Sequence, residues 1–127
     1  MSQNSAVIDD FVAAWKSMDL DKIMSFFTPD AVYINMPIEP ASEGLEAIRK
    51  TIEGFIGMAD QIEFVVKHTS ENASGVVMNE RVDRFHLKDG GKWVEAQVMG
   101  VFELEGGKIK AWRDYFDLAG FTGQMGG

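Results

Sequence analysis

Arg81, Asp83 and Asp114 are the side chains of this sequence best suited to acid–base chemistry. Arg81 and Asp83 lie two residues apart in NERVDRF (79–85), and Asp114 lies in WRDYFD (112–117). Residues i and i+2 of a β-strand point to the same side of a sheet, so Arg81 and Asp83 share one face. If that face is the core, a carboxylate and a guanidinium are buried together, which needs a reason because buried charge is costly. If it faces solvent, the pair is an ordinary surface ion pair.

The strand register expected here brings Asp114 close to this pair. A two-residue turn at 89–90 pairs Arg81 with Val98, and a three-residue loop at 105–107 then pairs Val98 with Asp114. Arg81 is therefore expected to reach across Val98 and bridge two carboxylates on an apolar face. With a cation between them, one carboxyl group can keep a proton while the other stays ionised, which is the arrangement that acid–base chemistry uses.

A second polar pair, Tyr33 and Asn35, has the same spacing on an earlier strand. A phenol and an amide on an inward face can orient a water molecule or a substrate oxygen. The alternative is that Tyr33 is a core aromatic residue with its hydroxyl group at the edge. Candidates for substrate contacts, with core packing as an equal alternative, share the faces of these polar groups: Trp112, Phe116, Phe85 and Val77.

The elements that must position these residues follow from a change of hydrophobic period along the chain. The pattern predicts helices at 5–18, from Asp19 to Phe27 and from Gly44 onward; strands at 31–36, 61–71, 75–88, 92–104 and 108–117; a loop at 37–42; and a loose, Gly-rich tail after Leu118. Helices followed by a strand meander predict one α+β domain over residues 1–127. We expect N-terminal helices packed in a strongly curved, mixed but mostly antiparallel, cone-shaped sheet with a ligand pocket at its open end.

Composition narrows the class of partner and the kind of chemistry. The 127 residues carry a net charge of −8, which argues against nucleic acid or an anionic membrane as the main partner. There is no cysteine, hence no thiolate ligand or nucleophile, and His68 and His86 lack the spacing of metal ligands. No apolar run approaches the length of a membrane span. We therefore expect a cytoplasmic protein with a neutral or weakly charged ligand, no metal site formed by these residue types, and no cofactor.

Three stretches together resemble the limonene-1,2-epoxide hydrolase family, within the nuclear-transport-factor-2-like (SnoaL-like) fold: YINMP (33–37), NERVDRF (79–85) and GVFELEGGKIKAWRDYFD (100–117). The resemblance covers nearly the whole chain in order and spacing. It implies a one-step, metal-free addition of water to a small apolar epoxide, cyclic or terpene-like, giving a vicinal diol. The family usually has a longer tail than AGFTGQMGG, so the resemblance does not indicate how the pocket is closed in this protein.

The resemblance also implies a role for each polar residue. The family's water-activating base matches Asp83, its proton donor to the epoxide oxygen matches Asp114, and the arginine that links them matches Arg81. Two further residues that hold the nucleophilic water match Tyr33 and Asn35.

Two other functions stay open at this point. An isomerase or cyclase of the same fold, acting on a steroid-like or polyketide ketone, would use an aspartate base with oxyanion donors. A non-catalytic binder of small molecules would need neither carboxylate. Arg113 and Tyr115 alternate with Asp114 and should point outward, which favours a homodimer formed through the outer face of the sheet.

Overall fold

The computed structural model describes residues 3–126, apart from the side chain of Glu39. The elements along the chain are α1 (Gln3–Ala14), a 3-10 turn η1 (Trp15–Ser17), α2 (Leu20–Met24), β1 (Phe27–Asn35), β2 (Ile38–Glu43), α3 (Gly44–Gly57), β3 (Ala59–Glu71), β4 (Val77–Leu87), β5 (Trp93–Glu105), β6 (Lys108–Phe116) and α4 (Leu118–Gly126). The predicted α+β architecture is confirmed. Within residues 3–126, no helix combines the length and the apolar character that crossing a bilayer requires.

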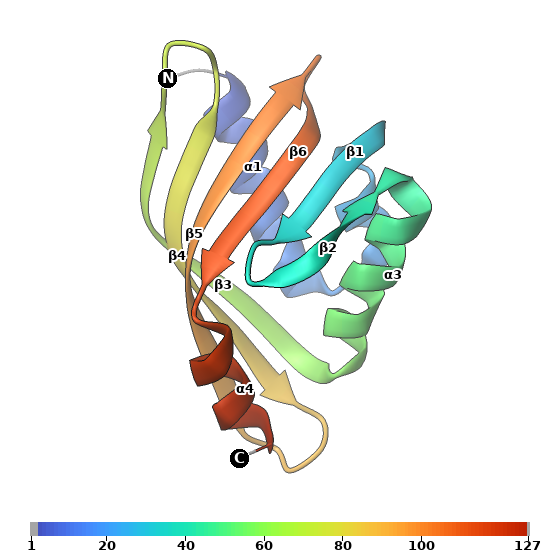
Figure 1. The fold of residues 1–127 in the computed structure, drawn as a ribbon, viewed down its shortest axis with the longest axis vertical. Coiled ribbons are helices and arrows are strands. Elements are labelled where there is room, and N and C mark those ends of the chain that lie inside the picture. Colours follow the sequence, from blue (N-terminus) through green and yellow to red (C-terminus); the bar gives the residue numbers. More distant parts are fainter. Residues whose placement is uncertain (1–2, 127) are drawn as a thin grey trace.

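The six strands form one sheet in the order β2-β1-β6-β5-β4-β3. All neighbouring strands are antiparallel except β1 and β6, which run parallel. The sheet bends around α1 without closing into a barrel, and α3 lies beside the β1–β2 edge (Figure 1). The parallel pair matters for the site because it places Asn35 of β1 directly beside Asp114 of β6.

The core lies between the helices and the concave face of the sheet. On α1, Ile8 and Phe11 are fully buried, and the ring of Phe11 makes edge contacts with aromatic side chains of β1, β5 and β6. Every odd-numbered residue of β4 from Val77 to Leu87 is buried. The inward face of this strand therefore consists of two apolar ends with Asn79, Arg81 and Asp83 between them.

Of the segment predicted as a loop at 37–42, residues 38–42 instead belong to strand β2, and Pro37 lies in the turn before it. Pro37 and Pro40 suggested a loop because proline cannot donate a ladder hydrogen bond. β2 is an edge strand with β1 as its only partner, and proline is tolerated on such a strand.

The Gly-rich tail is also not loose, because residues 118–126 form α4 (the red helix of Figure 1). Two contacts secure it. Phe121 is buried against Phe85 and Phe116, and the side-chain amide of Gln124 exchanges two 2.8 Å hydrogen bonds with the backbone of Glu95. The Gln124 amide thus bonds the backbone of β5 as a neighbouring strand would. Tertiary contacts of this kind override the poor helix propensity of glycine.

The predicted register is confirmed on one side of β5 and wrong on the other. Arg81 does pair with Val98, but Val98 pairs with Phe116, and Asp114 pairs with Gly100. The turn has two residues, 106–107, and a bulge at 103–104 adds a further shift. The two changes together move β6 by two residues, so Asp114 keeps the predicted face but lies one row further along the sheet.

Candidate active site

Arg81 bridges two carboxylates in the protein core. Its side chain is fully buried, and its Nε–H donates to Asp83 Oδ1 at 2.7 Å. Its Nη2 donates to Asp83 Oδ2 at 3.2 Å and to Asp114 Oδ2 at 2.5 Å. The core alternative of the sequence analysis is therefore the correct one, and Arg81–Asp83 is not a surface ion pair.

Gly100 is what allows the guanidinium group to reach across the sheet. It lies on β5, between Asn79 of β4 and Asp114 of β6. A Cβ atom at Gly100 would lie 2.4 Å from Arg81 Nη1 and 2.9 Å from Asp114 Oδ1. The guanidinium therefore occupies the space that a side chain would otherwise fill. Residue-by-residue reasoning missed this position, although a glycine inside a strand is a signal of close approach.

Asn79 binds the third nitrogen of the same guanidinium group. Its Oδ1 accepts a hydrogen bond of 2.9 Å from Arg81 Nη1, and its side chain is buried. All three nitrogens of the guanidinium group therefore have a partner, which fixes its plane. Asn79 was not among the predicted site residues, although it is the first residue of the NERVDRF stretch.

Tyr33 and Asn35 join the site on the Asp114 side. The Tyr33 hydroxyl donates to Asn35 Oδ1 at 3.1 Å, and its ring stacks on Trp112 with 4.0 Å between the ring centroids. Trp112 in turn donates from Nε1 to Asp114 Oδ1 at 2.6 Å. Asp114 thus has both oxygens bonded and has two polar neighbours from β1 that can hold a water molecule beside it.

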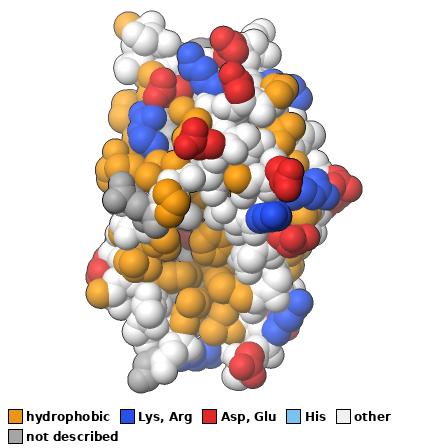
Figure 2. All heavy atoms as spheres, turned by 45° about the vertical axis from the view of Figure 1, so that its right-hand side comes forward, with side chains coloured by type: hydrophobic (Ala, Val, Ile, Leu, Met, Phe, Trp, Pro, Cys, Tyr) orange, Lys and Arg blue, Asp and Glu red, His pale blue; other side chains and the backbone are white. Residues whose placement is uncertain are grey.

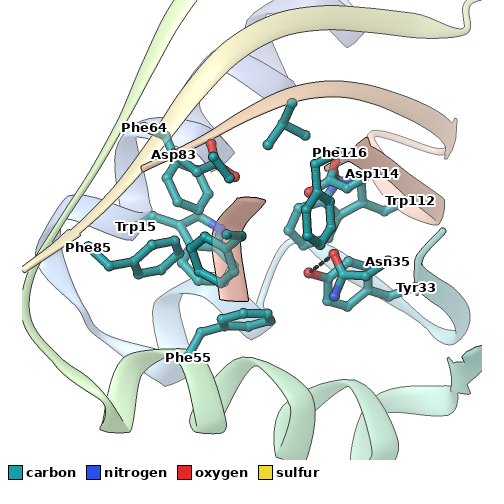
Figure 3. Close-up of a pocket in the computed structure, with 13 residues that line it drawn as sticks. Trp15, Tyr33, Asn35, Phe55, Phe64, Asp83, Phe85, Trp112, Asp114 and Phe116 are labelled. Atoms are coloured by element: carbon teal, nitrogen blue, oxygen red, sulfur yellow. Dashed lines mark hydrogen bonds between the residues drawn. The ribbon is translucent and has the colours of Figure 1, made fainter. Parts of the chain in front are cut away.

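A cavity of about 30 Å³ lies in front of this cluster, with room for very few water molecules. Its wall contains Asp83, Asp114, Tyr33 and Asn35 together with apolar and mostly aromatic side chains: Trp15, Phe55, Phe64, Phe85, Ala96, Val98, Trp112, Phe116 and Phe121. Figure 3 shows the two carboxyl groups on opposite sides of the pocket. In the lower half of Figure 2, hydrophobic side chains surround a hollow, as expected at the mouth of an apolar pocket.

The predicted substrate contacts are partly supported by this cavity. Trp112, Phe116 and Phe85 line it, whereas Val77 does not. Val77 pairs with Phe102 beyond the Asn79 row, on the side of Arg81 away from the pocket, and is fully buried in the core. Arg81 is also absent from the cavity wall, because it lies behind the carboxyl groups that it connects.

The comparisons with known proteins agree with this geometry. Residues 2–125 match the model of the limonene-1,2-epoxide hydrolase catalytic domain. The chain belongs to this epoxide hydrolase family. It is 32% identical over 112 residues to epoxide hydrolase EphG of Mycobacterium tuberculosis, covering 87% of this chain and 71% of that protein.

Two solved structures show how far the likeness to family members and to the wider fold extends. A limonene-epoxide-hydrolase-like epoxide hydrolase from M. tuberculosis superimposes with a TM-score of 0.75 at 26% identity, covering 95% of this chain and 87% of that one. SalBIII, described as an epoxide hydrolase/cyclase-like enzyme in pyran ring formation in salinomycin, has a TM-score of 0.82 at 20% identity and 92% coverage of both chains. The second likeness shows the fold alone.

In this member of the epoxide hydrolase family, burial raises the pKa of both carboxyl groups. Desolvation is the main cause for Asp83, whose pKa rises to about 7 although Arg81 lowers it; the charge of Asp114 raises it further. Desolvation also raises the pKa of Asp114, against the charge of Arg81 and the hydrogen bonds from Arg81 and Trp112.

The other two ionisable groups of the site keep their protons. Burial lowers the pKa of Arg81, but Asp114 and Asp83 outweigh burial and raise it overall. Burial, and next the charge of Asp114, raise the pKa of Tyr33 well above its ordinary value. Near neutral pH the site therefore holds a charged arginine and a neutral phenol beside two carboxyl groups whose pKa values are raised.

The raised pKa of Asp83 predicts that stability falls as the pH rises. Between about pH 4 and pH 7 the folded protein keeps a proton that Asp83 of the unfolded chain has released, so folding is favoured at the acid end of this window. We expect the free energy of unfolding in urea to drop by roughly 1–3 kcal/mol from pH 5 to pH 8. In Asp83→Asn the drop should be smaller, with the remainder due to Asp114. Parallel pH profiles for the two proteins would contradict the raised pKa.

The two histidines take no part in this site. His86 is on the outer face of β4, where its Nδ1 lies 2.6 Å from Asp60 Oδ1, and His68 is exposed on β3. In residues 3–126 no three His, Asp or Glu side chains are grouped so that they could hold a metal ion.

Proposed function

We propose that this protein hydrolyses a small apolar epoxide to a vicinal diol in one step. The observation that carries the proposal is the buried Asp83–Arg81–Asp114 bridge, whose two carboxyl groups face one aromatic-lined cavity. A proton acceptor and a proton donor on opposite sides of a strained ring are what concerted ring opening requires. Membership of the epoxide hydrolase family supports the reaction class.

The residues divide the reaction between them as follows. Asp114 takes a proton from a water molecule held beside Tyr33 and Asn35, and the water oxygen forms a bond to one epoxide carbon. The bond from that carbon to the epoxide oxygen breaks, and Asp83 gives its proton to this oxygen. A proton then returns from Asp114 to Asp83, through product or solvent, before the next turnover.

This assignment exchanges the roles that the family resemblance implied for the two aspartates. The raised pKa of Asp83 supports the exchange, because a carboxyl group with a pKa of about 7 can donate a proton near neutral pH. Position supports it too, because Asp114 is the carboxylate paired across the sheet with Asn35, whereas Asp83 lies on the far side of Arg81.

Product analysis in ¹⁸O-labelled water tests the reaction class. The wild-type protein would be incubated with limonene oxide, cyclohexene oxide and styrene oxide, with a chelator present and Asp83→Asn as the control. We expect one labelled oxygen in the diol from at least one epoxide, from the wild type alone. No diol from any of the three, with the protein folded, would reject hydrolysis of this substrate class. Exchange of carbon-bound hydrogen of a ketone in deuterated water would indicate an isomerase instead.

A cyclase is the second candidate, because the same acid–base pair can activate a hydroxyl group of the substrate in place of water. A cavity of about 30 Å³ leaves little room for water, which favours an internal nucleophile whenever the substrate carries one. An epoxide with a hydroxyl group four or five carbons away separates the two reactions. A cyclic ether without ¹⁸O indicates cyclisation, and a labelled triol indicates hydrolysis.

We also propose a homodimer formed through the outer face of the sheet. Tyr115 and Met99 are paired neighbours on this face and are 45% and 44% exposed, and Val65 is 41% exposed two strands away. Light scattering after size exclusion should give twice the chain mass of 14.1 kDa, and Met99→Lys/Tyr115→Lys should give the monomer. Leu45→Lys, on α3, is the control that leaves the mass unchanged. A monomeric wild type at micromolar concentration would reject the dimer.

A further inference from the structure

The indole nitrogen of Trp15 is a buried hydrogen-bond donor without a partner. Within residues 3–126, only Trp15 Nε1 and Asn79 Nδ2 are buried side-chain polar atoms that lack a hydrogen bond. Such groups are rare in folded proteins because a buried donor without an acceptor is unfavourable. Of the two residues, only Trp15 contributes to the wall of the cavity.

Trp15 lies between the two halves of the acid–base pair. Its ring stacks on Phe64 with 4.7 Å between centroids, and Phe64 pairs with Asp83 across the β3–β4 ladder. On its other side it meets Trp112, the residue bonded to Asp114, at 6.0 Å. In Figure 3 the ring of Trp15 lies below Asp83, with the edge that carries the nitrogen turned toward the middle of the pocket.

We propose that the Trp15 N–H donates a hydrogen bond to the epoxide oxygen of the bound substrate, beside the Asp83 carboxyl group. This inference rests on the function proposed above. As the carbon–oxygen bond breaks, negative charge grows on that oxygen, and a fixed donor in a water-poor cavity stabilises the charge before and while Asp83 supplies its proton. Trp15 keeps its own proton throughout. The substrate oxygen thereby becomes the missing partner of this indole.

The ligand-free pocket is narrow, so the substrate must move a wall to reach Trp15. Phe121 of α4 closes the pocket against Phe85 and Phe116. α4 contains Gly120, Gly123 and Gly126, each of which weakens a helix relative to alanine. We therefore expect α4 to be the wall that moves when the substrate enters.

The kinetic test is Trp15→Phe, which removes the N–H and keeps an aromatic ring. We expect kcat for an epoxide that the wild type hydrolyses to fall about 10- to 100-fold, with a smaller change in KM, because the donor acts mainly in the transition state. Trp93→Phe, on the outer face, is the control with wild-type kinetics. Diol formation by Trp15→Phe at the wild-type rate would overturn the role of Trp15 and leave the proposed function intact, whereas no diol from the wild type would overturn the function.

An NMR measurement tests the hydrogen bond without turnover. Indole ¹⁵N–¹H signals of Asp114→Asn would be recorded with cyclohexene oxide and with bicyclo[4.1.0]heptane, which has CH₂ in place of the epoxide oxygen. The Trp15 signal, assigned by adding Trp15→Phe, should move downfield with the epoxide and not with the hydrocarbon. Equal movement with both ligands, or none with either, would show that the N–H meets only aromatic ring faces and would reject the proposal.

Discussion

The rate of diol formation by Asp114→Ala should be at least about 10³-fold lower than that of the wild type. Added azide should restore ring opening in this variant. Without Asp114 no group removes the proton of the attacking water. Azide is an anionic nucleophile that needs no base, and the shortened side chain leaves space for it beside Asn35. The product would be an azido alcohol, its oxygen protonated by Asp83, quantified by mass spectrometry.

Asp83→Ala is the matched control for this rescue. It should lose activity to a similar extent, but azide should not restore it, because the opening ring then lacks its proton donor. Rescue of Asp83→Ala and not of Asp114→Ala would return the base to Asp83 and the acid to Asp114. Undiminished hydrolysis by either variant, with its near-ultraviolet circular dichroism unchanged, would reject the acid–base pair altogether.

Gly100→Ala should lower kcat/KM about 10²-fold and lower the free energy of unfolding by about 1–3 kcal/mol, although it adds only one methyl group. The new Cβ would lie 2.4 Å from Arg81 Nη1 and 3.0 Å from Asn79 Oδ1, both parts of a buried hydrogen-bonded network. The guanidinium must move, and its bonds to Asp83 and Asp114 move with it. Urea unfolding and diol formation would be measured on the same preparation.

Gly54→Ala is the control for this substitution. Gly54 lies on α3 with no atom within 4 Å of an added Cβ, so alanine there should leave activity unchanged and stabilise the helix slightly. If Gly100→Ala retained wild-type activity, the guanidinium could shift without consequence, and its exact position would not matter for the reaction.

The sequence predicts most of the site because strand alternation is a local property. The shared face of Arg81 and Asp83 and the pairing of Arg81 with Val98 both follow from a period of two and a two-residue turn. The turn is one residue shorter than expected and the bulge at 103–104 has no comparable signature, so together they misplaced the row of Asp114 by two residues. The predicted face of Asp114 is nevertheless correct, because a shift of two residues keeps a side chain on the same side of the sheet.

The features that the sequence does not predict depend on distant contacts. α4 forms because Phe121 and Gln124 bind partners on the sheet. The sequence of a glycine-rich segment does not reveal these distant partners. Val77 does not line the cavity, which the sequence could not predict because alternation gives the face of a residue but not which end of the sheet holds the cavity. The roles proposed for Asp83 and Asp114 rest on burial and on the pairing of Asn35 with Asp114, which only three-dimensional positions provide.

The parallel pairing of β1 with β6 determines when the active site can come into existence during synthesis. Asn35 and Asp114 are adjacent in the sheet, yet one belongs to the first strand and the other to the last. A chain emerging from the ribosome therefore holds Tyr33, Asn35, Arg81 and Asp83 for some time with no β6 to complete the sheet and no second carboxylate for the arginine. Contacts between such distant segments form late in folding. Catalytic activity should accordingly be the last property that a nascent or refolding chain acquires, appearing only after most of its helices and strands are in place.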